Sequence, residues 1–162
     1  VDSSTTLLDQ VDNLITLRTL SKAYGLASAR VGAAVGNSRV IAALDQLLMP
    51  FPLPAACVDA ALSQTGTDAL LRLRAQWSTL LSERTRLKTA LEGHPAVRCV
   101  WPSDANFLLM SCDAPAALVD HCHARGLLVR LIRGGERDYV RLTIGQPEEN
   151  DLFLGALAEQ AA

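Results

Sequence analysis

Apolar side chains recur at helical spacing over one long stretch of the chain, and this stretch is its clearest element. Between Thr67 and Gly93 they are three or four residues apart, and Arg84 fills the one polar place in the series. The apolar members are Leu70, Leu73, Trp77, Leu80, Leu87 and Leu91. Thr67 and Asp68 are typical of a helix start, and Gly93 with Pro95 is typical of a stop. The pattern predicts a helix of about 25 residues, or roughly 37 Å, which is longer than one small core needs.

The residues before this helix form shorter elements. Apolar runs at 13–18 and 31–35 predict two strands. Between them lies a segment of small and polar residues, Thr19 to Arg30. A proline-rich stretch then separates two short helices, expected over 39–48 and 54–63.

The residues after the long helix alternate between strands and helices. Four strands are expected, at 97–101, 106–110, 127–131 and 139–144. A helix over 114–125, capped by Asp113, ends at Gly126, and a last helix opens at Pro147. This pattern predicts a small α+β unit.

Composition and charge exclude several classes of protein. The 162 residues are 49% hydrophobic and 20% charged, which is typical of a globular chain with a real core. With a net charge of -2, the chain lacks the excess of basic residues that is typical of a nucleic-acid binder. No apolar run approaches the ~20 residues that span a bilayer. We therefore expect neither nucleic-acid nor membrane partners.

The four cysteines are unevenly spaced, and we expect no signal peptide before them. They are Cys57, Cys99, Cys112 and Cys122. We expect reduced thiols in a cytoplasmic protein. His121 and His123 flank Cys122, but neighbours on a helix point in different directions, so we expect Cys122 to face inward and no metal site to form.

The candidate chemistry lies in the segment Thr19 to Arg30. Lys22 and Lys88 are the only lysines among 15 basic residues. An amine, unlike a guanidinium, can lose its proton and bond covalently to an aldehyde. Thr19 and Ser21 offer hydroxyl groups beside Lys22, and Arg30 can hold a dianion. The segment favours a cradle for a phosphorylated aldehyde, against the simpler interpretation of an ordinary lysine at a strand end.

The segment T-L-S-K-A-Y-G-L-A-S-A-R-V-G resembles the cofactor-lysine segment of fold type I pyridoxal-phosphate aminotransferases. Among these the chain is most similar to the histidinol-phosphate aminotransferases. The resemblance continues through P-F-P-L-P (50–54), A-N-F-L-L (105–109) and V-R-L-T-I-G-Q-P-E-E-N-D (140–151). One departure is Ser28-Ala29, where the family more often has Gly-Leu.

The resemblance implies a role for each matching residue around pyridoxal 5'-phosphate. Lys22 matches the lysine that holds the cofactor covalently and later moves the substrate proton. Ser21 and Arg30 match groups that bind the cofactor phosphate, assisted by Thr19. Arg141 matches the arginine that binds the substrate carboxylate or phosphate.

A second substrate-anion arginine is matched by Arg130. Neighbouring strands can direct Arg130 and Arg141 to one cleft. We expect Arg133 and Arg137 to be ordinary surface arginines. Asp2 follows Val1 as in the family's aspartate motif, but the next residues of that motif are missing, so Asp2 is not assigned.

The expected fold class is α/β, the C-terminal part of a fold type I pyridoxal-phosphate transferase. Residues 1–65 would end the large cofactor domain, 66–92 would form a bridging helix, and 93–162 the small C-terminal α+β domain. The implied reaction is amino transfer between histidinol phosphate and 2-oxoglutarate in histidine biosynthesis. The intact enzyme would be a homodimer, and the chain alone would be nearly inactive.

Two alternatives stay open. The first is another fold type I enzyme, an aromatic aminotransferase or a decarboxylase of a phosphorylated substrate. The second is a non-catalytic assembly or binding module.

Overall fold

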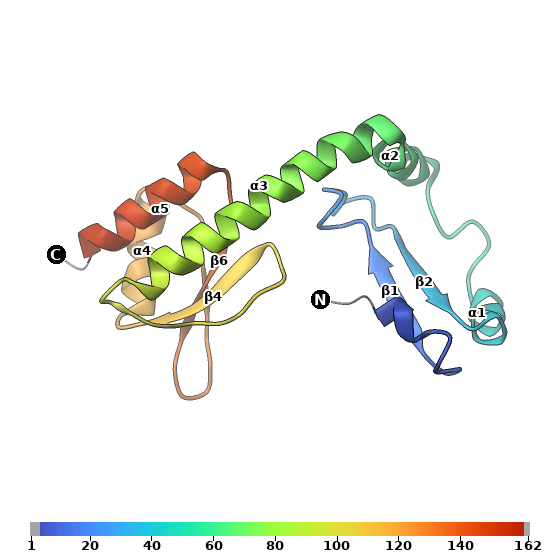
Figure 1. Cartoon of the computed structure of the whole chain (residues 1–162), viewed down its shortest axis with the longest axis horizontal. Coiled ribbons are helices and arrows are strands. Elements are labelled where there is room, and N and C mark those ends of the chain that lie inside the picture. Colours follow the sequence, from blue (N-terminus) through green and yellow to red (C-terminus); the bar gives the residue numbers. More distant parts are fainter. Residues whose placement is uncertain (1–3, 161–162) are drawn as a thin grey trace. The chain divides into compact units, whose positions relative to one another are not determined.

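A computed structural model describes residues 4–160, and Asp2 lies outside them. The chain divides into two compact units, Val1–Ala75 and Gln76–Ala162, and the boundary between them falls inside one long helix (Figure 1). That helix is α3, Thr67–Glu92. The long helix expected from the apolar spacing is therefore confirmed.

The first unit is built around two antiparallel strands. They pair from Ile15 opposite Gly36 to Thr19 opposite Gly32. A Cβ at Gly32 would lie 2.7 Å from the carbonyl oxygen of Arg18, so this close pairing requires glycine. The elements before α3 are a 3-10 turn at Ser4–Leu7, β1 (Ile15–Thr19), β2 (Gly32–Gly36), α1 (Ser38–Asp45) and α2 (Ala55–Thr65).

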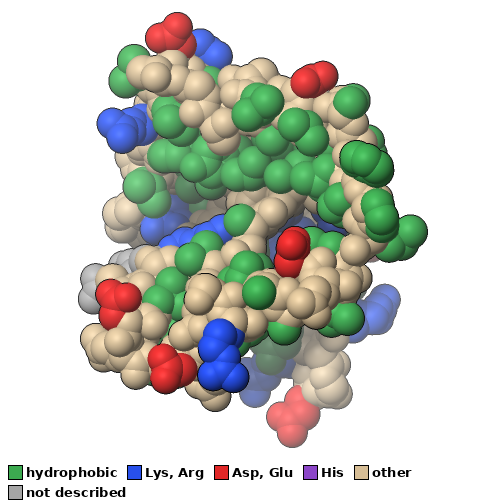
Figure 2. All heavy atoms as spheres, turned by 90° about the vertical axis from the view of Figure 1, so that its right-hand side faces the viewer, with side chains coloured by type: hydrophobic (Ala, Val, Ile, Leu, Met, Phe, Trp, Pro, Cys, Tyr) green, Lys and Arg blue, Asp and Glu red, His purple; other side chains and the backbone are tan. Residues whose placement is uncertain are grey.

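Most large apolar side chains of the first unit are exposed. Phe51 is 96% exposed, Leu47 81% and Leu17 77%. Figure 2 shows hydrophobic side chains gathered on the surface of this unit. Only Thr16, Ala29, Ala69 and Leu73 are buried among its described residues. The two strands and short helices therefore enclose almost no core.

The second unit is a four-stranded antiparallel sheet in the order β3-β4-β6-β5. Its elements are β3 (Val97–Val100), β4 (Phe107–Cys112), α4 (Pro115–Ala124), β5 (Arg130–Ile132), β6 (Tyr139–Thr143) and α5 (Pro147–Gln160). Alternate residues of β4 and β6 join the core on one face of the sheet: Leu108, Met110, Val140 and Leu142. Side chains of the three helices complete this core: Leu87, Leu91, Leu118, Cys122, Phe153 and Leu157.

Two local expectations were wrong. Asp113 does not cap α4, because its carboxylate pairs with Arg98, and the N-cap position is Ala114 without a side-chain bond. The strand expected at 127–131 begins only at Arg130. The amide of Leu127 instead donates to the carbonyl of Cys122 and closes the end of α4.

Candidate functional site

The loop between β1 and β2 is closed at its base and turned sharply at its tip. The amide of Leu20 donates to Val31 O at 3.1 Å, and that of Leu26 donates to Leu20 O at 3.1 Å. Gly25 has φ +67°, a conformation that favours glycine, and its amide donates to Lys22 O at 3.1 Å. These bonds hold Lys22 in a defined turn rather than in a free coil.

The two hydroxyl groups of the loop are paired. Thr19 Oγ1 donates to Ser21 Oγ at 2.8 Å, and the amide of Ser21 donates to Thr19 Oγ1 at 3.1 Å. In this arrangement the hydroxyl hydrogen of Ser21 is directed elsewhere and remains a donor for an anion. Thr19 thus orients Ser21.

Arg30 sits at the far end of the loop in an uncommon conformation. Its φ of 54° lies in the left-handed region, which costs a non-glycine residue about 1–2 kcal/mol. Its Nη1 donates to Ala27 O at 3.2 Å, and the residue is exposed. Such strain in a loop is typical of positions that have a functional constraint.

The two lysines differ in their surroundings. Lys88 pairs with Glu92 across one helical turn at 2.8 Å. Lys22 is exposed, and within residues 4–160 no ion pair or hydrogen bond of its amine is found. Its amine is therefore open to react, whereas that of Lys88 is held by a carboxylate.

On the second unit, two arginines face each other across neighbouring strands. Arg130 of β5 is the register partner of Arg141 of β6, so both side chains leave the same face of the sheet, opposite the helices. Arg130 is exposed and Arg141 is half-buried. The two arginines therefore lie on neighbouring strands, as expected, and their shared cleft and anion-binding role stay a prediction.

Phe107 is a neighbour of Arg141 that the sequence did not point to. The guanidinium carbon of Arg141 lies 5.1 Å from the centre of the Phe107 ring, which is within the range of a cation–π contact. The Nε of Arg141 is buried and has no hydrogen-bond partner among the described residues. The arginine is thus held by stacking and keeps an unused donor.

The burial of the Glu83 carboxylate was also not predicted from the sequence. Glu83, not Arg84, is the buried polar residue of α3, at 7% exposure. Its partners Arg86 and Asn150 make the burial tolerable. Glu83 stands between Leu80 and Leu87 at helical spacing, and this position was the available signal.

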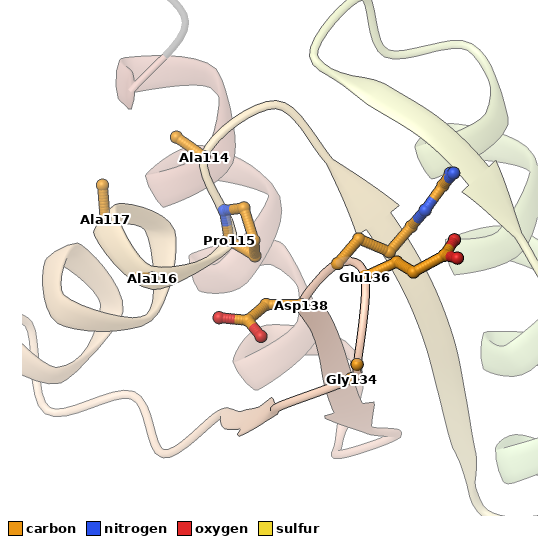
Figure 3. Close-up of a pocket in the computed structure, with 9 residues that line it drawn as sticks. Ala114, Pro115, Ala116, Ala117, Gly134, Glu136 and Asp138 are labelled. Carbon is orange, nitrogen blue, oxygen red and sulfur yellow. The ribbon is translucent and has the colours of Figure 1, made fainter.

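A hollow of about 590 Å³ in the second unit is lined by neither Arg130 nor Arg141. It is formed by the start of α4 and the loop between β5 and β6 (Figure 3). Asp138 points toward the first turn of α4, while Glu136 points away. Glu136, Arg137 and Asp138 line this hollow, so it holds side chains of both charges.

The cysteines agree with the expectation of free thiols. All four are free, and Cys122 is buried in the core as expected. Burial raises the pKa of the Cys122 thiol and that of Cys112. Over the part of the chain that the structure describes, no cluster of metal-ligating side chains is present. In the same residues no helix has the length and apolar character to cross a membrane.

Comparison with known proteins decides the family. The family described as aminotransferase class I and II matches residues 2–157. The chain belongs to this family. The family's members are pyridoxal-phosphate enzymes, in agreement with the expected cofactor.

Histidinol-phosphate aminotransferases are among this aminotransferase chain's relatives. Histidinol-phosphate aminotransferase 2 of Idiomarina loihiensis is 41% identical over 160 residues, covering 98% of this chain and 44% of the relative. The histidinol-phosphate aminotransferase of Stenotrophomonas maltophilia is 40% identical over 162 residues, covering 99% and 44%. The chain thus spans less than half the length of these relatives.

Solved structures agree with the fold. A putative histidinol-phosphate aminotransferase from Erwinia carotovora atroseptica matches with a TM-score of 0.82 and 25% identity, over 99% of this chain and 46% of that one. A decarboxylase from Sulfurospirillum multivorans matches with a TM-score of 0.85 and 28% identity, over 99% and 47%. The expected α/β fold class of fold type I aminotransferases is therefore confirmed.

Proposed function

We propose that this chain carries the cofactor lysine and the substrate-anion arginines of a histidinol-phosphate aminotransferase. The observation that carries the proposal is the loop of the first unit. It carries Lys22, whose amine has no partner within residues 4–160, next to the hydroxyl donor Ser21, and it ends in the exposed guanidinium of Arg30. The 40–41% identity to histidinol-phosphate aminotransferases supports this substrate.

The donor set of the loop fits pyridoxal 5'-phosphate. The orientation of the Ser21 hydroxyl by Thr19 leaves one O–H for a phosphate oxygen, and Arg30 supplies charged N–H donors. When bound, the cofactor supplies an aldehyde that takes up amino groups and a ring that withdraws electrons from the reacting carbon. Lys22 Nζ holds the cofactor and moves the proton of the substrate α-carbon. Arginine could not do this because it does not lose its proton.

Arg141 and Arg130 would bind the anionic end of the substrate. The buried Nε of Arg141 has no hydrogen-bond partner in the part of the chain that the structure describes, and Arg130 directly opposite adds a second positive charge. A carboxylate of 2-oxoglutarate or the phosphate of histidinol phosphate would accept hydrogen bonds from both. A fixed pair of guanidinium groups orients such a dianion.

The organisation of the intact protein is part of the proposal. Residues 1–65 would end a large cofactor domain, 66–92 would form the bridging helix, and 93–162 the small C-terminal domain. The enzyme would act on small molecules as a cytoplasmic homodimer, without nucleic-acid or membrane partners. Its free thiols support the cytoplasmic assignment.

A decarboxylase of a phosphorylated amino acid is the second candidate function. It is favoured by the structural match to the Sulfurospirillum decarboxylase. It is also favoured by a match with a TM-score of 0.77 and 26% identity to the L-threonine-O-3-phosphate decarboxylase of Porphyromonas gingivalis. Both reactions use a cofactor lysine and anion-binding arginines, so the substrate separates them.

The experiment is a chimera in which this chain replaces the matching segment of the Idiomarina loihiensis relative. We expect amino transfer from histidinol phosphate to 2-oxoglutarate, lost in Lys22→Arg and kept in the matched control Lys88→Arg. Carbon dioxide released from threonine phosphate without amino transfer would favour the decarboxylase. Full activity of Lys22→Arg would contradict the proposed role of the lysine.

A further inference from the structure

A buried carboxylate holds the second unit together at one end of its sheet. The side chain of Glu83 is 9% exposed. Its Oε1 accepts from Arg86 Nε at 2.9 Å, and its Oε2 accepts from Arg86 Nη2 at 2.7 Å and from Asn150 Nδ2 at 2.8 Å. Both oxygens are thus engaged, as a buried charge requires. Glu83 lies on α3 and Asn150 on α5, so this bond joins two helices far apart in the sequence.

Asn150 also binds the backbone just after β6 and so links it to Glu83. It is 2% exposed, and its Oδ1 accepts from the amide of Gly145 at 3.0 Å. Its Nδ2 also donates to the carbonyl of Gly145 at 3.1 Å. A Cβ at Gly145 would lie 3.1 Å from Cβ of Glu149, so the turn is tightly packed. The side chain of Asn150 therefore fixes both polar groups of Gly145 and, through them, the turn that follows β6.

Arg84, the next residue of α3, holds the start of β4 at the same end of the sheet. Arg84 Nη1 donates to the carbonyl of Ala105 at 3.1 Å, just before β4 begins. The amide of Ile144, just after β6, donates to the carbonyl of Asn106 at 3.0 Å. Two consecutive side chains of α3 thus fix the start of β4 and the end of β6 relative to each other.

The arginine of the sheet face depends on this alignment. Arg141 lies on β6 and stacks on Phe107 of β4. Because its buried Nε has no hydrogen-bond partner among residues 4–160, stacking on a residue of the next strand is the contact that holds this part of the guanidinium. A shift of β6 along β4 would therefore move the guanidinium away from the ring, and with it the free donor.

We propose that Glu83 and Asn150 are positioning residues that hold Arg141 ready for the anionic end of its substrate. The identity of that anion rests on the proposed function, but the ordering of Arg141 does not. Glu83 touches neither Arg141 nor the ligand. It acts through Asn150, Gly145 and the alignment of β6 with β4.

The test is nitrogen-15 NMR of the Nε–H group of Arg141 in the 162-residue chain. Its order on the nanosecond timescale is measured first without ligand and then during titration with histidinol phosphate. Glu83→Gln removes the charge that Arg86 and Asn150 share. Asp113→Asn is the matched control, because it makes the same change at the exposed Arg98 ion pair of the same unit. Arg86→Gln serves as a milder variant at a half-exposed position if Glu83→Gln does not fold.

We expect the order of the Arg141 Nε–H group to fall in Glu83→Gln and to fall less in Arg86→Gln. In Asp113→Asn this order should be unchanged. Affinity for histidinol phosphate should weaken about tenfold in Glu83→Gln, the effect of about one charge-assisted hydrogen bond. Unchanged order and affinity in a folded Glu83→Gln or Arg86→Gln would overturn the proposal, even if the unfolding temperature fell. If the wild-type chain bound no histidinol phosphate while the order still fell in Glu83→Gln, the positioning role would stand and the proposed substrate would be wrong.

Discussion

The two units of this chain differ in how much core they enclose. The second unit encloses a core in which Leu87, Leu108 and Val140 are fully buried. The first unit exposes Leu17, Leu47 and Phe51, yet it carries the lysine. Local backbone hydrogen bonds therefore shape the loop around Lys22 without a core beneath it, whereas Arg130 and Arg141 lie on a sheet with a packed core.

The largest expected effect on the free energy of unfolding comes from shortening a buried side chain in the core of the second unit. Leu108→Ala should lower the free energy of unfolding by about 2–5 kcal/mol, because it leaves a cavity between sheet and helices. Leu47→Ala in the first unit is the matched control and should change it by less than about 0.5 kcal/mol. Urea unfolding followed by tryptophan fluorescence measures this, since Trp77 and Trp101 both belong to the second unit. Equal effects of both variants would contradict the division between the units.

A smaller effect is expected at the end of α4. Gly126 has φ +75°, so Gly126→Ala should destabilise the second unit by about 1 kcal/mol. Gly155 lies inside α5 with open space around it, so the matched Gly155→Ala should stabilise by about 0.5–1 kcal/mol. In the same urea assay, the changes in the free energy of unfolding of the two variants should have opposite signs. A stabilising Gly126→Ala would show that the left-handed turn is not required.

The smallest effect is a dependence on pH. Hydrogen bonds from Arg86 and then from Asn150 lower the pKa of Glu83 in the folded chain. The stabilisation they give is therefore fully present above the ordinary glutamate pKa, about 4.3, and is lost as the pH falls from there through the lowered value. The difference in unfolding free energy between the wild type and Glu83→Gln should be largest near neutral pH and shrink below pH ~4. A difference that stays constant with pH would contradict this account.

The sequence predicted what depends on neighbours along the chain. The spacing of apolar residues placed α3 within a residue or two of Thr67–Glu92. The two strands around the lysine segment and the pairing of β5 with β6 were likewise predictable. Local patterns suffice there because each element is specified by its own side chains.

Contacts between distant residues were not predictable. One partner of Glu83 is Asn150, 67 positions later, so this hydrogen bond could not be read from α3 alone. Asp113 has the chemistry of a helix cap, but Arg98 on the neighbouring strand takes its carboxylate. Phe107 beneath Arg141 depends on the register of β4 with β6, which only the folded sheet determines.

The proposed role of Lys22 as the amine that takes the cofactor can be tested in the 162-residue chain. The chain is incubated with pyridoxal 5'-phosphate, treated with borohydride to make the attachment permanent, and mapped by peptide mass analysis. We predict preferential labelling of Lys22 over Lys88, whose amine is paired with Glu92, and loss of that labelling in Lys22→Arg. Equal labelling of Lys22, Lys88 and the N-terminal amine would contradict the account.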